Sequence, residues 1–275
     1  MRSKLKNKRR IVVKVGTSTL SYKNGRLNFQ RIANLSYVLS TLRSRRYEVL
    51  LVSSGAIGVG AGRIGMIGKP KDLAIKQALA AIGQAELIKI YQKFFEEFNQ
   101  FVAQVLLTKD IVTIPDRHQN ARNTLLNLLN MGIIPIINEN DTISTYEIEY
   151  GGNFGDNDTL SANVATLVNA DLLILLSDID GLYSADPKKE SGAEIIHSVE
   201  TITPELEQLA SGTGSSFGTG GMITKIAAAK ICQDANIDTV IINGSDPARI
   251  FDVLEGSEIG THFVAGKDKV LIKNE

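Results

Sequence analysis

Hydrophobic and polar positions form two kinds of pattern along the chain. Short runs rich in leucine and β-branched residues are apolar at almost every position, which is typical of strands covered on both faces of a parallel sheet. These runs lie at 10–16, 48–55, 102–108, 132–141, 172–178 and 238–244. Longer segments between them repeat apolar residues every three to four positions and predict helices. They lie at 28–45, 71–98, 116–131, 158–169 and 222–235.

The alternation of strand and helix predicts the fold class. It favours an α/β protein, a three-layer αβα sandwich with a mainly parallel central sheet. No internal repeat, linker-like or low-complexity segment interrupts the order, so we expect residues 1–275 to form a single domain. The basic start "MRSKLKNKRR" departs from the pattern, and we expect residues 1–9 to be a solvated, flexible tail.

The amino-acid composition limits the classes of molecule that the protein is expected to bind. The 275 residues carry 30 Lys and Arg against 30 Asp and Glu, so no net charge would attract nucleic acid or an anionic membrane. Cys232 is the only cysteine, which excludes an internal disulfide and suits a reducing compartment. No apolar run approaches the ~20 residues of a membrane span, and no apolar segment follows the basic start as a signal peptide would require. We expect a cytoplasmic protein that acts on a small molecule.

The segments that follow the predicted strands are unusually polar. They read "KVGTST", "SSGAIGVGAG", "NENDTIS", "SDIDGLY" and "INGSDP". Such Gly, Ser, Thr, Asn and Asp residues supply hydrogen bonds and permit close backbone approach. Because ligands of open α/β sheets bind beyond the carboxyl ends of the strands, we expect the functional site there.

The segment "GTGGMITK", at the start of the last predicted helix, is a candidate phosphate-binding loop. It is not a P-loop, because Lys225 lies seven residues after Gly218 with no glycine directly before it. The segment "GAGRIG" at 60–65 formally fits a dinucleotide motif, but it lies inside an apparent helix. Glycines at a helix N-terminus still present amide hydrogens and a positive dipole end to an anion. Simple helix capping is the alternative.

Lys14 lies near the end of a predicted strand, where a buried ammonium group requires an anionic partner. The alternative is an edge-strand lysine that points to water. Two lysines, Lys14 and Lys225, facing one crevice would suit phosphoryl transfer, which depends on positioning and on stabilising the charge of the phosphoryl oxygens.

The densest polar run is 138–158. One of its last three residues is expected to cap the next helix. Carboxylates that bind an amino group, together with amides that donate to a carboxylate, would recognise a zwitterionic amino acid.

The three histidines, His118, His197 and His262, have no Ser or Cys pattern typical of a catalytic triad, and we expect surface or capping roles for them. A carboxylate acceptor is already ionised at neutral pH and needs no general base. The absence of a triad therefore fits a kinase that acts on a carboxylate.

Together these segments resemble the amino acid kinase family. The resemblance covers nearly the whole chain, through "VVKVGTS", "VSSGAI", "QALAAIGQ", "LLTKDI", "NARNTL", "PIINENDTIS", "FGDNDTLSA", "LLSDIDGLYSADP" and "GTGGMITKIAAAK". "NENDTIS" and "GDND" are typical of members that phosphorylate the γ-carboxylate of L-glutamate, the first step of proline synthesis. "KVGTS" and "SSGA" occur in looser form in acetylglutamate, carbamate, aspartate and uridylate kinases. The resemblance implies direct in-line transfer from ATP to glutamate.

The resemblance also implies roles for individual residues. Lys14 and Lys225 would stabilise the phosphoryl group during transfer, and Asp158 would hold both lysines. Glutamate would be bound by Ser54, Gly55, Asn138, Asp141 and Asn157. ATP would contact Lys14, Ser177, Asp178, Thr219, Gly220, Gly221, Met222, Ile223, Thr224 and Lys225. Mg²⁺ would be held mainly by ATP oxygens and water, and no protein metal ligand is assigned.

Several partners follow from the resemblance alone. It implies a homodimer or homotetramer, for which 71–98 and 116–131 could supply an interface. It also implies feedback inhibition by proline and a functional link to glutamate-5-semialdehyde dehydrogenase. Many bacterial members carry a C-terminal PUA domain, and we expect none here because the sequence ends soon after "GTHFVAGKD".

Three alternatives remain open from the sequence. The first is a family member that acts on acetylglutamate or aspartate. The second is a non-catalytic amino-acid or nucleotide sensor on the same fold. The third is a dehydrogenase, which the misplaced "GAGRIG" disfavours.

Overall fold

The computed structural model describes residues 2–22, 26–66, 70–143, 157–185, 187, 190, 192–211 and 221–266. Its strands are β1 (Arg10–Val15), β2 (Glu48–Ser53), β3 (Val102–Leu107), β4 (Ile134–Glu139), β5 (Leu172–Ser177), β6 (Ser198–Val199), β7 (Asp238–Asn243) and β8 (Thr261–Phe263). Its α-helices are α1 (Thr17–Leu20), α2 (Phe29–Ser44), α3 (Ala56–Arg63), α4 (Leu73–Glu96), α5 (Pro115–Asn130), α7 (Asn157–Leu167), α8 (Pro204–Ser211), α9 (Gly221–Asp234) and α10 (Arg249–Leu254). Two short 3₁₀ helices are η1 (Arg2–Asn7) and η2 (Lys109–Ile111).

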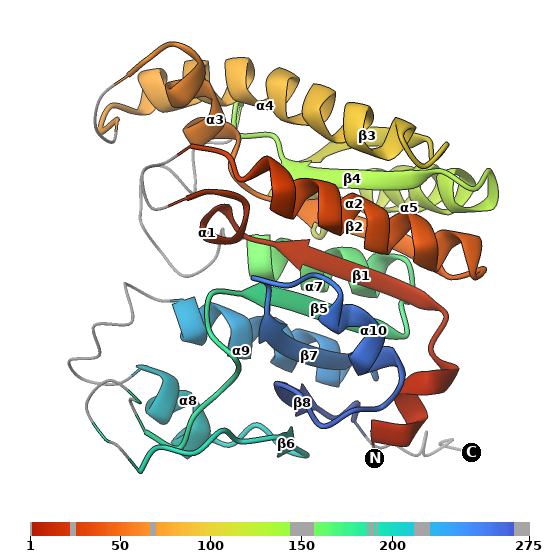
Figure 1. Ribbon diagram of the computed structural model, residues 1–275, viewed down its shortest axis with the longest axis vertical. Helices are drawn as coiled ribbons and strands as arrows, with labels where there is room; N and C mark the ends of the chain where they lie inside the picture. The colour runs from red at the N-terminus through yellow and green to blue at the C-terminus, as the bar shows by residue number, and fades with distance from the viewer. Residues whose placement is uncertain are drawn as a thin grey trace.

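An eight-stranded sheet forms the centre of the molecule, in the order β3-β4-β2-β1-β5-β7-β8-β6 (Figure 1). The pairings from β3 to β7 are all parallel. β8 runs antiparallel to β7, and β6 pairs in parallel with β8. The mainly parallel sheet that the sequence predicts is therefore confirmed, and all six predicted strands are present.

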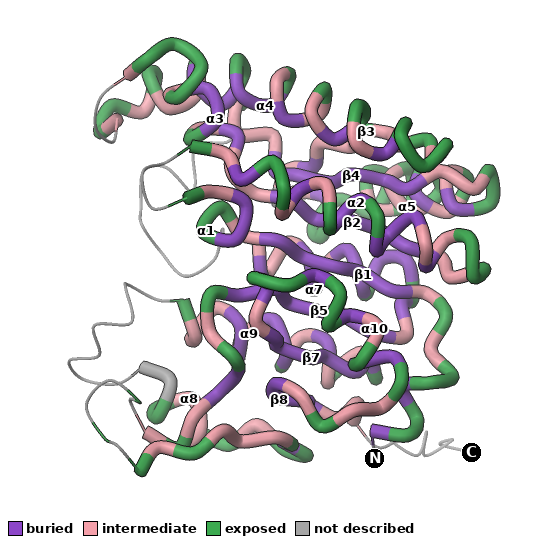
Figure 2. Tube along the Cα trace, viewed as in Figure 1, coloured by how far each residue is buried: buried purple, intermediate pink, exposed green. Residues whose placement is uncertain are grey.

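Helices cover both faces of the sheet. On β1, the side chains of Ile11, Val13 and Val15 pack into one hydrophobic cluster with α2, α4 and α10. Val12, which points the opposite way, packs into a second cluster with α5, α7 and α9. Figure 2 shows the buried strands enclosed by helices whose outer faces are exposed. Burial on both sides explains the continuous apolar runs and confirms the three-layer αβα sandwich.

The strand order has a reversal at β1. Strands β2, β3 and β4 lie on one side of β1, and the chain then crosses to β5 on the other side of β1. A crevice for ligands is expected outside the carboxyl ends of strands at such a switch point. Helices α1, α3, α7 and α9 all begin at this end, at the left of Figure 1.

The flexible tail expected for residues 1–9 is wrong for the described residues 2–9. Residues 2–7 form η1, and the side chain of Leu5 is completely buried in the first cluster. The guanidinium of Arg2 donates hydrogen bonds to the backbone carbonyls of His197, Ser257, Ile259 and Gly260. The charge of the segment suggested solvation, but one apolar side chain and one multidentate donor fix it to the fold.

The surface role expected for His262 is also wrong. His262 lies on β8, is 1% exposed, and its Nε2 is 2.6 Å from Oδ1 of Asp238 on β7. Lys8 Nζ lies 2.6 Å from the other carboxylate oxygen of Asp238. Burial would raise the pKa of Asp238, but hydrogen bonds with His262 and Lys8 outweigh it and lower this pKa to about 2.

Within the described residues, no helix combines the length and apolar character that crossing a membrane requires.

Candidate active site

Two lysines meet one aspartate at the carboxyl end of β1. Lys14 is on β1 and, like Val12, faces α7 and α9, because side chains two positions apart share a face of a strand. Its Nζ lies 2.5 Å from Oδ1 of Asp158, the second residue of α7. Lys225, in the second turn of α9, places its Nζ 3.0 Å from Oδ2 of the same carboxylate. The anionic partner that the sequence predicts for Lys14 is therefore present.

All three charged groups of this centre are nearly inaccessible. Lys14 is 7% exposed, Asp158 3% and Lys225 9%. Thr224 Oγ1 also donates to Asp158 Oδ2 at 2.8 Å. Burial alone would raise the pKa of Asp158, but the charges of Lys14 and Lys225 outweigh it and lower this pKa. Asp158 is therefore ionised, and one carboxylate holds two ammonium groups at its opposite oxygens.

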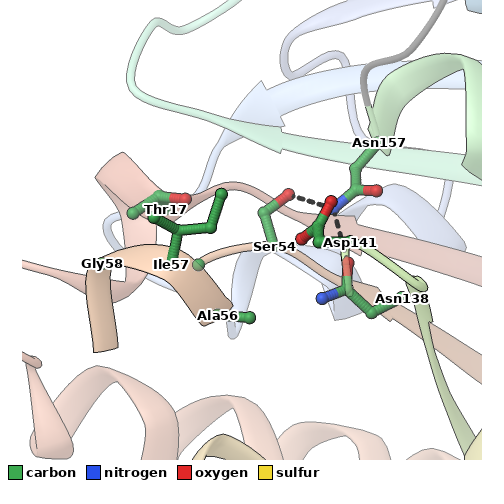
Figure 3. Close-up of a pocket in the computed structure, with 9 residues that line it drawn as sticks. Thr17, Ser54, Ala56, Ile57, Gly58, Asn138, Asp141 and Asn157 are labelled. Carbon is green, nitrogen blue, oxygen red and sulfur yellow. Dashed lines mark hydrogen bonds between the residues drawn. The ribbon is translucent and has the colours of Figure 1, made fainter. Parts of the chain in front are cut away.

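A pocket of about 280 Å³ opens beside this centre. Its lining comes from four neighbouring segments: the start of α1, the loop from β2 into α3, the end of β4 with the residues after it, and the start of α7. The lining residues are Thr17, Ser54, Gly55, Ala56, Ile57, Gly58, Asn138, Asp141 and Asn157 (Figure 3). A cavity of this size suits a small metabolite rather than a polymer. All five residues that the resemblance assigns to glutamate therefore line one pocket.

The polar side chains of the pocket are joined by hydrogen bonds. Nδ2 of Asn157 donates to Ser54 Oγ at 2.6 Å and to Asn138 Oδ1 at 2.9 Å, as the dashed lines of Figure 3 mark. Asn157 directly precedes Asp158 on α7. The first two residues of one helix thus contribute to both the pocket and the lysine centre, which places the two side by side.

The loop from β2 into α3 requires glycine at position 55. Gly55 has φ = 110°, in the left-handed region that other residues avoid. This conformation turns the chain sharply after Ser54 and starts α3 beside the pocket. The polar loop that the sequence predicts after β2 is therefore a sharp bend, and it places Ser54 at the wall of the pocket.

Apart from Lys14, the residues that the resemblance assigns to ATP fall into two groups. Ser177 ends β5 and its Oγ donates to Asp178 at 3.3 Å. Gly221, Met222, Ile223, Thr224 and Lys225 form the first five residues of α9. The Lys225 ammonium donates to the Gly221 carbonyl at 2.9 Å, so the lysine folds back toward the helix start. Thr219 and Gly220 lie outside the described residues.

The sequence interpretation missed several pocket residues. Thr17, Ala56, Ile57 and Gly58 line the cavity but were assigned no role. Thr17 follows a predicted strand end, a position that could have identified it. Gln84 on α4 accepts a hydrogen bond from Asn138 Nδ2 at 2.9 Å, and no local signal in the sequence links these two residues.

Metal ions in proteins are commonly held by clusters of acidic, histidine or cysteine side chains. No group of three or more His, Cys, Asp or Glu side chains that could bind a metal occurs among the residues described. Asp158, the carboxylate at the lysine centre, is engaged by both ammonium groups. These residues do not form a protein cage for Mg²⁺.

Comparison with known sequences agrees with this geometry. The model of the amino acid kinase family matches residues 9–243, and the chain therefore belongs to the amino acid kinase family. It is 51% identical over 269 residues to a glutamate 5-kinase of Listeria monocytogenes, covering 98% of each chain. It is also 53% identical over 267 residues to a glutamate 5-kinase of Clostridium perfringens, covering 97% of this chain and 99% of that one.

Solved structures of the same fold are more distant in sequence. An isopentenyl phosphate kinase of T. acidophilum superimposes with a TM-score of 0.62 at 19% identity, covering 92% of this chain and 99% of that one. A UMP kinase of Ureaplasma parvum gives a TM-score of 0.64 at 17% identity, covering 94% and 99%. These likenesses confirm the fold.

Proposed function

We propose that this chain is an ATP-dependent kinase that transfers the γ-phosphoryl group of ATP to the γ-carboxylate of L-glutamate. The products are γ-glutamyl 5-phosphate and ADP, and the reaction is the first step of proline synthesis from glutamate. The observation that carries this proposal is the centre of Lys14, Asp158 and Lys225 beside a pocket lined by amides, a carboxylate and a hydroxyl. The relatives named glutamate 5-kinase support the choice of acceptor.

The lysine centre supports phosphoryl transfer through charge. The three equatorial oxygens of a transferring phosphoryl group carry negative charge, which fixed cations stabilise most strongly where water is excluded. Lys14 and Lys225 are buried and reach the same carboxylate from different elements. Asp158 keeps both ammonium groups in place when no phosphate is bound, so they need little reorganisation when ATP arrives. A sensor that only binds ligands would have no need for this pair.

The pocket supports an amino acid as acceptor. A zwitterion presents an ammonium group, which requires acceptors, and carboxylates, which require donors. Asp141 and the amide oxygens supply acceptors, whereas the Ser54 hydroxyl and amide N–H groups supply donors. The γ-carboxylate is ionised at neutral pH, so it attacks the phosphorus directly and the phosphorus–oxygen bond to ADP breaks. No covalent enzyme intermediate forms.

Mg²⁺ would be bound together with the nucleotide. Mg²⁺ commonly binds through phosphate oxygens and water with few protein ligands, and we expect the same arrangement here. It supplies neutralisation of phosphate charge, and Lys14 and Lys225 supply the remaining positive charge at the transferred group.

The acceptor assignment is tested by ADP release with a substrate panel. Purified protein with MgATP should release ADP with L-glutamate and much less with N-acetylglutamate or aspartate. A preference for either of the other acids would favour the neighbouring family members instead. No ADP above background with any acid would favour a non-catalytic sensor.

Two pocket variants test the glutamate site. Asn157→Ala and Asp141→Ala should raise the KM for glutamate about tenfold or more, since each removes a hydrogen-bonding group from a desolvated pocket. The KM for ATP should change little. Equal rises in both KM values would contradict the assignment of the pocket.

The assembly and regulation follow from the same proposal. A homodimer or homotetramer is supported by exposed apolar side chains near the ends of α4 and α5, including Phe101 at 73% and Met131 at 71%. Light scattering measures the assembly directly. Proline, the product of the pathway, would inhibit the reaction. Glutamate-5-semialdehyde dehydrogenase would consume the labile acyl phosphate. We expect the reaction to take place in the cytoplasm.

A further inference from the structure

The buried amide of Gln84 is linked to the pocket by a hydrogen bond with Asn138, a residue that lines it. Gln84 lies on α4, is 7% exposed, and accepts a hydrogen bond from Asn138 Nδ2 at 2.9 Å. Asn138 is 2% exposed and lines the pocket. Gln84 is not among the residues that line the pocket, and it is connected to a lining residue by its hydrogen bond with Asn138.

The packing of α4 against α3 brings Gln84 to this place. A methyl group on the adjacent Gly83 would lie 1.8 Å from the carbonyl oxygen of Ala56, the first residue of α3. The two backbones are therefore in direct contact just after the Ser54–Gly55 bend. This contact fixes the part of α4 that carries Gln84 relative to the pocket loop.

Gln84 begins a relay of four polar side chains. Gln84 Oε1 accepts from Asn138 Nδ2, and Asn138 Oδ1 accepts from Asn157 Nδ2. Asn157 Nδ2 also donates to Ser54 Oγ at 2.6 Å. Each amide has a donor end and an acceptor end, so the orientation of Gln84 sets the direction of every later hydrogen bond.

The direction of the relay decides what Ser54 can offer a ligand. Because Ser54 Oγ accepts from Asn157, its own hydrogen is free to point toward an acceptor in the pocket. If Gln84 presented its NH₂ group instead, Asn138 and Asn157 would reverse and the Ser54 hydrogen would be used on Asn157 Oδ1. An anionic carboxylate requires a donor, and only the first arrangement provides one at Ser54.

We propose that Gln84 is a positioning residue for the acceptor substrate: its carbonyl oxygen sets the direction of the relay through Asn138 and Asn157, so that the Ser54 hydroxyl donates to a carboxylate oxygen of the bound amino acid. This proposal deepens the proposed function and rests on it.

Two substitutions at position 84 separate orientation from packing. Gln84→Met keeps the side-chain length but removes the acceptor, and it should raise the KM for glutamate about tenfold, near the effect of one lost hydrogen bond. Gln84→Glu keeps an acceptor when ionised, and at pH 8 it should stay within about threefold of wild type. The KM for ATP should not change in either variant. Gln92→Met, an exposed position on the same helix, is the matched control and should behave as wild type.

A double-mutant cycle tests the route through Ser54. If Gln84 acts on Ser54, then Gln84→Met should raise the KM less than about threefold in a Ser54→Ala background, because coupled residues are not additive. A full tenfold effect in that background would overturn the route. Calorimetric titration with glutamate gives the same comparison for binding alone.

The outcomes also separate this inference from the proposed function. Wild-type protein that does not phosphorylate glutamate would overturn the proposed function. Active wild type with an unchanged Gln84→Met variant would overturn only the positioning role. Equal impairment of Gln84→Met and Gln84→Glu, with a raised KM for ATP, would assign Gln84 to packing and likewise overturn it.

Discussion

The lysine centre depends on the direction in which one side chain of β1 points. Lys14 shares a face with Val12, whereas Val13 and Val15 point to the α2 side. A shift of one residue in this strand would turn Lys14 away from Asp158 and Lys225 and place a hydrophobic side chain in the site. The burial of this charge in a strand is therefore explained by the ion pair of Lys14 with Asp158 on α7.

Removing one ammonium group should lower turnover more than binding. Lys225→Met should reduce kcat by about 100-fold, because charge stabilisation of a transition state contributes about 3 kcal/mol per group. Lys230→Met is the matched control, since Lys230 lies on the same helix in an exposed pair with Glu207, and its kcat should stay near wild type. Steady-state kinetics with saturating ATP and glutamate measures both, and wild-type turnover in Lys225→Met would remove this residue from the mechanism.

Removing the shared carboxylate should destabilise the protein as well as inactivate it. Asp158→Asn leaves two buried ammonium groups without an anion, which typically costs about 3 kcal/mol. Asp116→Asn is a suitable control, because Asp116 is also the second residue of a helix but is exposed. Urea unfolding without nucleotide measures the difference, and equal stabilities of the two variants would contradict the role of Asp158 as the holder of both lysines.

Some residue assignments could be reached from the sequence and others could not. The need of Lys14 for an anion followed from a charged residue near the end of an apolar run. The pairing with Asp158 depended on family resemblance, because residues 144 positions apart in sequence meet only through the sheet order. Asn138 had a family role, but Gln84, 54 positions away, had none, and no local pattern connects the two residues.

The contact between helices α3 and α4 positions the loop from β2 into α3, which lines the pocket. Gly60 and Gly83 face each other, and a methyl group on Gly60 would lie 2.0 Å from the carbonyl oxygen of Leu79. The two helix backbones can lie in contact here because neither Gly60 nor Gly83 has a side chain. Glycine in these helices therefore has a packing purpose, and the dinucleotide reading of "GAGRIG" is unnecessary.

Adding a methyl group at this contact should disturb both stability and the glutamate site. Gly83→Ala forces the helices apart and should cost about 2 kcal/mol, as overpacked interiors do, and it should raise the KM for glutamate by moving the Ser54 loop. Gly62→Ala on α3 meets no atom within 4 Å, so it should be neutral or stabilising by up to about 1 kcal/mol. Thermal unfolding and steady-state kinetics measure the pair, and a Gly83→Ala protein as stable as Gly62→Ala would contradict the close contact.

The length of a helix or strand determines whether it can be predicted from the sequence. The six strands and five helices with strong periodicity are observed with ends that differ by at most two residues. The short elements α8, α10, β6 and β8 were not predicted, because two to eight residues carry too little periodicity and depend on tertiary contacts. β8 illustrates this, since its three residues are held by pairing with β7 and β6.

A second charged cluster lies at the end of the sheet opposite to the lysine centre. Asp238 starts β7, far along the strand from Asn243, and Lys8 approaches it just before β1 begins. The cluster of Lys8, Asp238 and His262 joins the N-terminal segment to β7 and the antiparallel strand β8. Its contribution belongs to stability rather than to catalysis.

The pH dependence of stability should report this cluster. The pKa of Asp238 falls from 3.8 to about 2 on folding, so its stabilisation is present above about pH 4 and is lost as the pH falls toward 2. The shift corresponds to roughly 2 kcal/mol. Asp238→Asn should therefore be less stable than wild type by about this amount at pH 7, with the difference shrinking below pH 4. Urea midpoints between pH 2.5 and 7 measure it, and a constant difference over that range would contradict the assignment.

Trapping the acyl phosphate tests the proposed transfer of a phosphoryl group to the side-chain carboxylate of glutamate. Purified protein with MgATP, L-glutamate and hydroxylamine should form γ-glutamyl hydroxamate and ADP in equal amounts, and omission of either substrate should abolish both. Absence of the hydroxamate, or ADP release without it, would contradict the proposed function.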